Sequence, residues 1–191
     1  MRTSSIAEAI ETHGYSLIQC HKPYTPSIEA LSDFGQIDTL EGLNTVQTLT
    51  PQDLLEAPPN TYSGNFGVAE FPLHTDLAHW AVPPRFLALR CIKGSENIAT
   101  RLLDGRALIA HFGLELLRTI ILLPRRPMQN GKQLLQLLER VESSNQFRLR
   151  WDSIYLKPAT KYSSEQLTNV LAFISNSQPI ELILLERGDT C

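Results

Sequence analysis

The sequence predicts a mainly β, α+β fold in which a jelly-roll core, or double-stranded β-helix, is flanked by helices. Three observations lead to this prediction. The length of 191 residues is typical of one domain spanning 1–191 and is sufficient to bury a core. Hydrophobic residues make up 42% and charged residues 19%, as in ordinary globular chains. About seven strand-like segments are interspersed with helices, without the regular alternation of an α/β sheet.

Capping residues and apolar spacing predict the helices. Ser4 or Ser5 with Glu8 resembles a capping box, and Gly14 ends this first helix. Asp104 is placed to cap a helix that begins near Arg106. The other predicted helices are Ile28–Phe34, a buried helix within Leu108–Leu123 that runs into a strand or loop ended by Pro124, and a helix capped by Ser163 or Ser164 that continues through Ile174.

Apolar runs bounded by Pro, Gly or Asn predict the strands. These strands are Tyr15–Gln19, Thr45–Leu49, Arg85–Ile92, Ile98–Leu103 and Ile180–Leu185. Among them, Arg85–Ile92 is apolar enough to be a buried strand. Leu134–Val141 fits either a short helix or, with Phe147–Trp151 downstream, a hairpin.

Charge and cysteine content argue against several classes of function. The net charge of −3 offers no basic surface for nucleic acid. The three cysteines are odd in number and lack metal-type spacing, which suits a reducing cytosol better than a disulfide framework. The most apolar stretch, Leu108–Leu123, is interrupted by charged residues, and no signal peptide is recognisable. The sequence therefore predicts a cytoplasmic protein that binds neither nucleic acid nor membranes.

The segment Phe71–Trp80 contains the most informative short motif, His74-Thr75-Asp76. Residues two apart on an extended strand point to the same face, so one metal ion can contact both the His74 imidazole and the Asp76 carboxylate. This pair is two-thirds of the 2-His-1-carboxylate triad, which leaves positions open on Fe(II) for a co-substrate and O₂. A His-x-Asp triplet also arises by chance, and the alternative is a surface histidine beside a turn aspartate.

A longer series of motifs resembles the TauD/TfdA-like family, to which taurine dioxygenase and clavaminate synthase-like enzymes belong. The matching segments, in chain order, are His13-Gly14-Tyr15, Leu73-His74-Thr75-Asp76, Pro83-Pro84-Arg85-Phe86-Leu87-Ala88-Leu89, Thr100, Asp104-Gly105, Arg148-Leu149-Arg150-Trp151-Asp152 and Arg187-Gly188-Asp189. The resemblance implies a jelly-roll core, Fe(II) as the metal and 2-oxoglutarate as the co-substrate. It also implies a dioxygenase that hydroxylates an unactivated C–H bond of a small polar metabolite, and it favours the hairpin interpretation of Leu134–Val141.

The same resemblance assigns roles to individual residues. His74 and Asp76 match the first two iron ligands of the family. Thr100 matches the threonine that hydrogen-bonds the 2-oxoglutarate carboxylate. His79 and Trp80 follow the metal pair and are candidates for lining the substrate entrance; the alternative is a packed tryptophan and an exposed imidazole.

The family pattern continues past the point where this sequence stops, at Cys191. In the family, a turn like Gly188-Asp189 leads into a strand with the second histidine ligand, followed by an arginine for 2-oxoglutarate. The expectation is therefore a domain that is incomplete at its C-terminus, with the last core strands missing. The alternative function is a degenerate or truncated, non-catalytic jelly-roll module. A missing strand would leave a sheet edge for a partner, or for a second copy of the chain, to cover.

Overall fold

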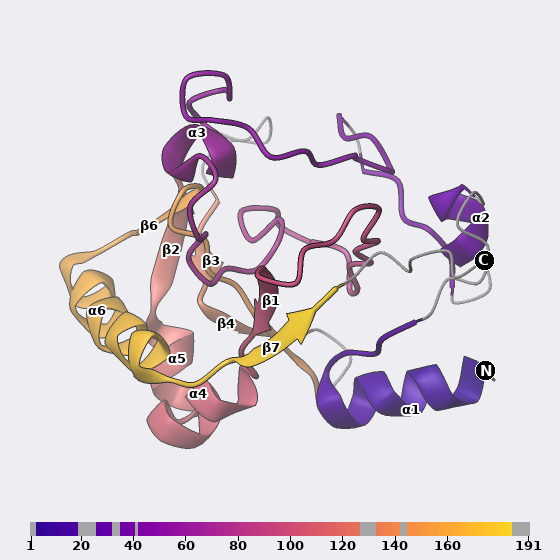
Figure 1. The fold of residues 1–191 in the computed structure, drawn as a ribbon. Coiled ribbons are helices and arrows are strands. Elements are labelled where there is room, and N and C mark those ends of the chain that lie inside the picture. The colour runs from indigo at the N-terminus through magenta and orange to yellow at the C-terminus, as the bar shows by residue number, and fades with distance from the viewer. Residues whose placement is uncertain are drawn as a thin grey trace, which may run out of the picture. The chain divides into compact units, whose positions relative to one another are not determined.

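The structure is a computed structural model that describes residues 3–18, 26–31, 35–40, 42–126, 133–141 and 145–184 (Figure 1). The chain divides into two compact units, unit 1 (Met1–Thr50) and unit 2 (Pro51–Cys191). Within the described ranges, no helix is long and apolar enough to cross a bilayer.

Unit 1 contains the helices α1 (Thr3–His13) and α2 (Ser27–Leu31). The first confirms the predicted N-terminal helix, which ends where the Gly14 N–H donates to the carbonyl four residues earlier at 2.9 Å. The φ angle of +82° at this residue explains why glycine stands there. The second confirms the start of the predicted helix Ile28–Phe34, whose last three residues lie outside the described ranges.

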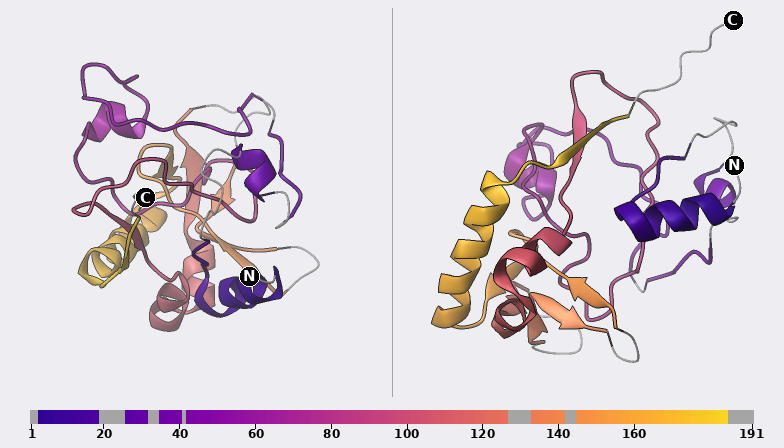
Figure 2. Two further views of the ribbon diagram at one scale, coloured as in Figure 1. Left: turned by 45° about the vertical axis from the view of Figure 1, so that its right-hand side comes forward. Right: turned by 90° about the horizontal axis from the view of Figure 1, so that it is seen from below.

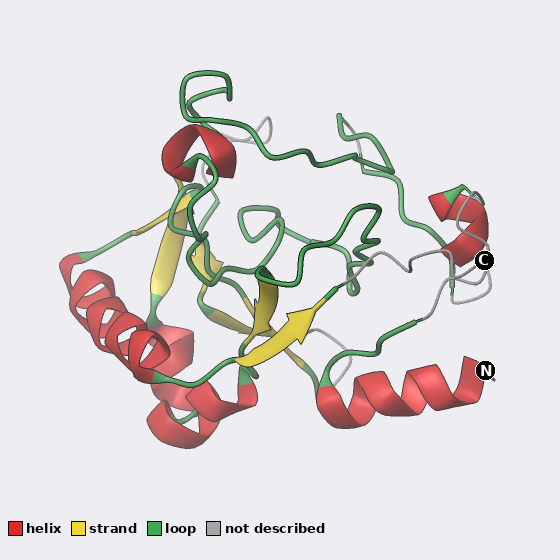
Figure 3. Cartoon of the chain, in the orientation of Figure 1, coloured by secondary structure: helices red, strands yellow, loops and turns green. Residues whose placement is uncertain are grey.

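Unit 2 is mixed α/β, with small antiparallel sheets and no closed barrel among its described residues. Its helices are α3 (Tyr62–Phe66), α4 (Arg106–Phe112), α5 (Leu114–Thr119) and α6 (Lys161–Asn176). Its strands are β1 (Ala99–Leu102), β2 (Ile121–Pro124), β3 (Leu135–Gln136), β4 (Leu138–Arg140), β5 (Phe147–Leu149), β6 (Leu156–Pro158) and β7 (Ile180–Ile183). Strand β1 pairs with β7, β2 lies between β3 and β6, and β4 pairs with β5. The chain from α3 to β1 contains neither helix nor strand (Figure 3).

The core of unit 2 forms where α4, α5 and α6, which gather on one side of this unit (Figure 2), pack against the strands. Its buried hydrophobic side chains are small or aliphatic. They are Ala78, Leu108, Leu117, Ile120, Leu122, Leu135, Leu137, Leu138, Leu156, Leu167 and Val170. Ala78 belongs to the long loop and follows the His74–Asp76 pair by two residues, so the core anchors the candidate site directly.

The predicted helix α6 is confirmed, and its cap differs from the prediction. The Thr160 hydroxyl accepts a hydrogen bond from the Ser163 N–H at 3.0 Å, which makes Thr160 the N-cap. Ser163 is buried instead, and its hydroxyl accepts from the Ile121 N–H at 3.0 Å. This bond ties α6 to β2.

The segment Leu108–Leu123 is confirmed as helix followed by strand, with a break between α4 and α5. The break lies at Gly113, whose φ angle is +78°. The N-cap of α4 is Gly105, which makes no side-chain cap bond, so the predicted Asp104 cap lies one residue too early. The Asp104 carboxylate instead accepts from the Arg106 N–H at 2.9 Å.

Two predicted strands and the hairpin are confirmed. Ile98–Leu103 contains β1, and Ile180–Leu185 begins with β7. Leu134–Val141 contains β3 and β4, and β4 pairs antiparallel with β5.

Three predicted strands are wrong. The described part of Tyr15–Gln19 and the whole of Thr45–Leu49 contain no strand. Arg85–Ile92 forms no strand either and is not buried, because Phe86 and Leu89 are each 61% exposed. Apolar composition shows that a segment suits a sheet, whereas a strand also needs a partner backbone to bond.

Candidate metal-binding site

The structure brings the His74 and Asp76 side chains together. The His74 Nε2 and Asp76 Oδ1 atoms are 3.9 Å apart, with the imidazole mostly buried and the carboxylate exposed. The pair lies in an irregular segment that enters a turn at Asp76, not on the strand that the motif suggests. One nitrogen donor and one oxygen donor at this separation can both contact a cation placed between them.

Two contacts orient the His74 imidazole. Its Nδ1 atom lies 2.8 Å from the Pro72 carbonyl oxygen. Because a carbonyl oxygen only accepts, Nδ1 carries a proton, and Nε2 is the ring nitrogen placed toward Asp76. The Tyr62 ring stacks on the imidazole with a centroid distance of 4.2 Å. The ring nitrogen that could bind a metal is therefore held in a fixed direction.

Thr75, between the two candidate ligands, fastens the segment to the chain after β5. Its backbone N–H donates to the Trp151 carbonyl at 2.8 Å. Its hydroxyl accepts from the Trp151 N–H at 3.0 Å. Thr75 thus makes two hydrogen bonds to the backbone of Trp151, which lies 76 positions further along the chain.

The turn after Asp76 requires an unusual backbone conformation. Leu77 has a φ angle of +53°, in the left-handed region that a leucine seldom adopts. The turn closes where the Trp80 N–H donates to the Leu77 carbonyl at 2.9 Å. The chain changes direction at this turn, so the residues after Leu77 do not continue the path of the His74–Asp76 segment.

Arg150 holds the far side of this turn. Its side chain is 1% exposed and donates to the carbonyls of Ala78, Trp80 and Ala81 at 3.4, 2.6 and 3.3 Å. It also forms an ion pair with Glu139 on β4. Burial lowers the pKa of the guanidinium, and the Glu139 carboxylate opposes that shift. Arg150 therefore fixes the loop of the candidate site.

A buried carboxylate and two tyrosines lie behind His74. Asp152 is 2% exposed, and its Oδ1 accepts from the backbone N–H groups of Ile154 and Tyr155 at 2.8 and 3.0 Å. The Tyr62 hydroxyl is buried without a well-formed hydrogen bond. Burial raises the pKa of the Tyr62 phenol, and the nearby Asp152 charge raises it further. Tyr62 is therefore a neutral wall of the site.

His79 and Trp80 lie beyond the turn. The His79 ring is 4.7 Å from that of Tyr155, and its Nδ1 atom is buried without a hydrogen-bond partner in the described part of the chain. Burial lowers the pKa of this imidazole, although the Asp152 charge opposes the shift. Trp80 contributes its carbonyl to Arg150. Their role at a substrate entrance stays a prediction.

Thr100 lies on β1, opposite Leu182 of β7. An ion pair between Arg101, its neighbour, and Glu70 links this strand to the start of the His74 segment. The part of Thr100 in holding a co-substrate stays a prediction.

Sequence reasoning missed Tyr62 and Tyr155 as parts of the site, and it named Arg150 and Asp152 only within the family-like segment from Arg148 to Asp152. Their partners lie far along the chain, so no local spacing marks them. The one available signal was the charge of Arg150 and Asp152 on either side of Trp151.

Among the residues that the structure describes, no three His, Cys, Asp or Glu side chains gather closely enough to hold a metal ion. His74 and Asp76 thus fit a metal as two donors of a set. Comparisons with protein-family models, with curated proteins and with solved structures found no match to this chain.

Proposed function

We propose that the chain is an Fe(II)- and 2-oxoglutarate-dependent dioxygenase of the TauD/TfdA-like type that hydroxylates an unactivated C–H bond of a small polar metabolite. The observation that carries the proposal is the approach of His74 Nε2 to Asp76 Oδ1 at 3.9 Å, with Nδ1 held by the Pro72 carbonyl. The small antiparallel sheets of unit 2 are compatible with the jelly-roll core included in this proposal.

In this proposal, His74 and Asp76 bind the iron and Thr100 binds the 2-oxoglutarate carboxylate. When bound, Fe(II) with 2-oxoglutarate supplies the O₂-dependent oxidation of the C–H bond. The chain's own residues orient the metal ligands and exclude water from the site. Pro72 fixes the His74 tautomer, and the Tyr62 ring covers one face of the imidazole. His79 and Trp80 are proposed to contact the substrate, and the three cysteines support a cytoplasmic location.

Anaerobic titration of the full chain with Fe(II), followed by 2-oxoglutarate, tests the proposal. We expect Fe(II) to bind and a visible charge-transfer band to appear when 2-oxoglutarate is added. His74→Ala should weaken Fe(II) binding at least about tenfold, because it removes a ligand outright.

His111→Ala is the matched control. This histidine lies on α4 and packs against Phe112 and Phe173 at ring distances of 4.6 and 4.4 Å. Fe(II) affinity should be unchanged in this variant. Equal affinity of the His74→Ala variant and the wild type would show that the site is misplaced.

The second candidate function is a non-catalytic jelly-roll module that binds a partner or a second copy of the chain. Two observations favour it. The described residues bring together two metal donors and no third. Large apolar side chains between the candidate site and β1 are exposed, including Phe86, Leu87, Leu89, Ile92 and Ile98. Absence of Fe(II) binding in the wild type, combined with concentration-dependent association, would select this function.

A further inference from the structure

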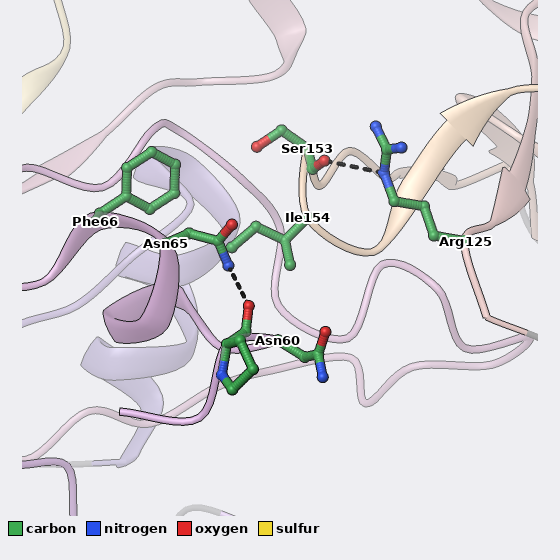
Figure 4. A pocket seen from close by; sticks show the side chains of 7 residues that line it. Asn60, Asn65, Phe66, Arg125, Ser153 and Ile154 are labelled. Carbon is green, nitrogen blue, oxygen red and sulfur yellow. Dashed lines mark hydrogen bonds between the residues drawn. The ribbon is translucent and has the colours of Figure 1, made fainter. Parts of the chain in front are cut away.

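A hollow of about 330 Å³ opens between the loop that leads into α3 and the turn after Asp152 (Figure 4). Its size is at the lower end of the range for small-molecule sites. Asn60, Asn65, Phe66, Arg125, Ser153 and Ile154 line it. Neither His74 nor Asp76 lines it, so the hollow is a separate feature from the candidate metal site.

Hydrogen bonds set the shape of the hollow without any ligand. The Asn65 amide nitrogen donates to the carbonyls of Pro59 and Thr61 at 3.1 and 2.8 Å, which closes the loop on one side. The Tyr155 hydroxyl donates to the Asn60 carbonyl at 3.0 Å and joins that loop to the opposite wall. Walls that are fixed in advance reduce the entropic cost of binding.

Arg125 supplies the charge in this hollow. Its backbone N–H donates to the Tyr155 carbonyl at 2.8 Å, and its Nε donates to the Ser153 carbonyl at 3.3 Å. No described residue forms an ion pair with it, and no carboxylate lines the hollow. Two backbone carbonyls therefore fix the base of the side chain while the terminal amino groups stay available. A planar guanidinium of this kind matches the two oxygens of a carboxylate.

Phe66 and Ile154 supply an apolar wall. Ring contacts with Tyr62 and Phe71, at centroid distances of 6.1 and 6.0 Å, hold the Phe66 ring in place. We propose that the hollow binds a small carboxylate ligand, with its carboxylate on Arg125 and its apolar or aromatic body against Phe66 and Ile154. The binding requires no metal and does not depend on the dioxygenase proposal.

Titration of the metal-free, full-length protein with benzoate, followed by amide chemical shifts, tests this inference. We expect saturable shifts in residues 59–66 and 153–155, with a dissociation constant on the order of 1 mM for so small a ligand. Arg125→Gln should weaken binding about fivefold or more, because the charged hydrogen bonds to the carboxylate are lost. Arg125→Lys, which keeps the charge and loses the planar fork, should fall in between.

Arg126→Gln is the matched control, since it removes the same charge from the adjacent arginine, which is exposed as Arg125 is but does not line the hollow. Its affinity for benzoate should match the wild type. Equal weakening by Arg126→Gln and Arg125→Gln would overturn the inference, as would the absence of shifts in the lining residues. Matching melting temperatures verify that the variants fold.

Two further probes separate charge from shape. Benzyl alcohol carries the ring without the charge, and inorganic phosphate carries charge without the ring. Both should bind several-fold more weakly than benzoate. If benzyl alcohol binds as tightly as benzoate, Arg125 does not contribute to the affinity. If phosphate binds as tightly as benzoate, the Phe66 wall does not contribute to it.

Discussion

Leu77 is the non-glycine residue of the described chain that has a positive φ angle, +53°, and it directly follows a proposed iron ligand. At ordinary positions, alanine is more stable than glycine by about 0.5–1 kcal/mol. In the left-handed region the order reverses, because Cβ crowds the following carbonyl oxygen.

We therefore expect Leu77→Gly to be more stable than Leu77→Ala by about 1 kcal/mol. Both variants lose the same side chain beyond Cβ, so their difference isolates the backbone term. Urea unfolding monitored by circular dichroism measures it. An alanine variant that is the more stable of the two would show that the turn after Asp76 does not have this conformation.

Arg150 is the buried cation that keeps the same turn in place. Arg150→Met removes the donor to three carbonyls, those of Ala78, Trp80 and Ala81. We expect a loss of about 3 kcal/mol in the free energy of unfolding, since buried acceptors are left without partners.

Arg148→Met provides the comparison, two residues earlier in the chain and on β5. Arg148 also pairs with Glu139, at 2.9 Å, but its side chain is 22% exposed. The expected loss is at most about 1 kcal/mol. Denaturant unfolding of the two variants side by side tests the claim, which fails if the losses are equal.

At the scale of elements, Ser163 joins α6 to the central strand β2. Its buried hydroxyl accepts from the Ile121 N–H at 3.0 Å, so Ser163→Ala leaves that backbone donor without a partner. We expect a loss of about 1–3 kcal/mol in thermal or denaturant unfolding. Ser164→Ala changes the adjacent, exposed residue of the same type and should alter stability by no more than about 0.5 kcal/mol. If the two variants are equally stable, the hydrogen bond between Ser163 and Ile121 does not contribute to the stability of the fold.

Elements with local signals were predictable from the sequence, and elements with distant partners were not. Helices α1, α4 and α6 carry apolar spacing and start or stop signals within or next to their own residues, and all three were predicted. Arg85–Ile92 was predicted as a buried strand from composition alone, and no strand forms there. A β-strand depends on residues elsewhere in the chain, which a single sequence does not identify.

The candidate site shows the same division. The spacing of His74 and Asp76 predicted that their side chains would meet, and they lie 3.9 Å apart. The means by which they meet was not predictable, because it depends on Trp151 and Arg150, about 70 or more positions away. Local spacing predicts the pair of ligands, and long-range contacts determine how their side chains are positioned.

For the whole molecule, the division into two units has a thermodynamic consequence. Every residue of the hydrophobic core cluster, from Ala78 to Val170, belongs to unit 2. In unit 1, Ile6 is the buried hydrophobic residue among those described. Unit 2 therefore has the apolar burial that drives cooperative folding, and a segment of 50 residues with so little burial does not.

We expect residues 51–191, expressed alone, to unfold in one cooperative transition with a melting temperature within about 5 °C of the full chain. Residues 1–50 alone should show the circular dichroism of an unfolded peptide, since two short helices without a core are marginal in water. Differential scanning calorimetry of both pieces beside the full chain makes the comparison. A non-cooperative transition in residues 51–191 would mean that the core of unit 2 is not self-sufficient, and the candidate site, which it anchors through Ala78, would then depend on unit 1 as well.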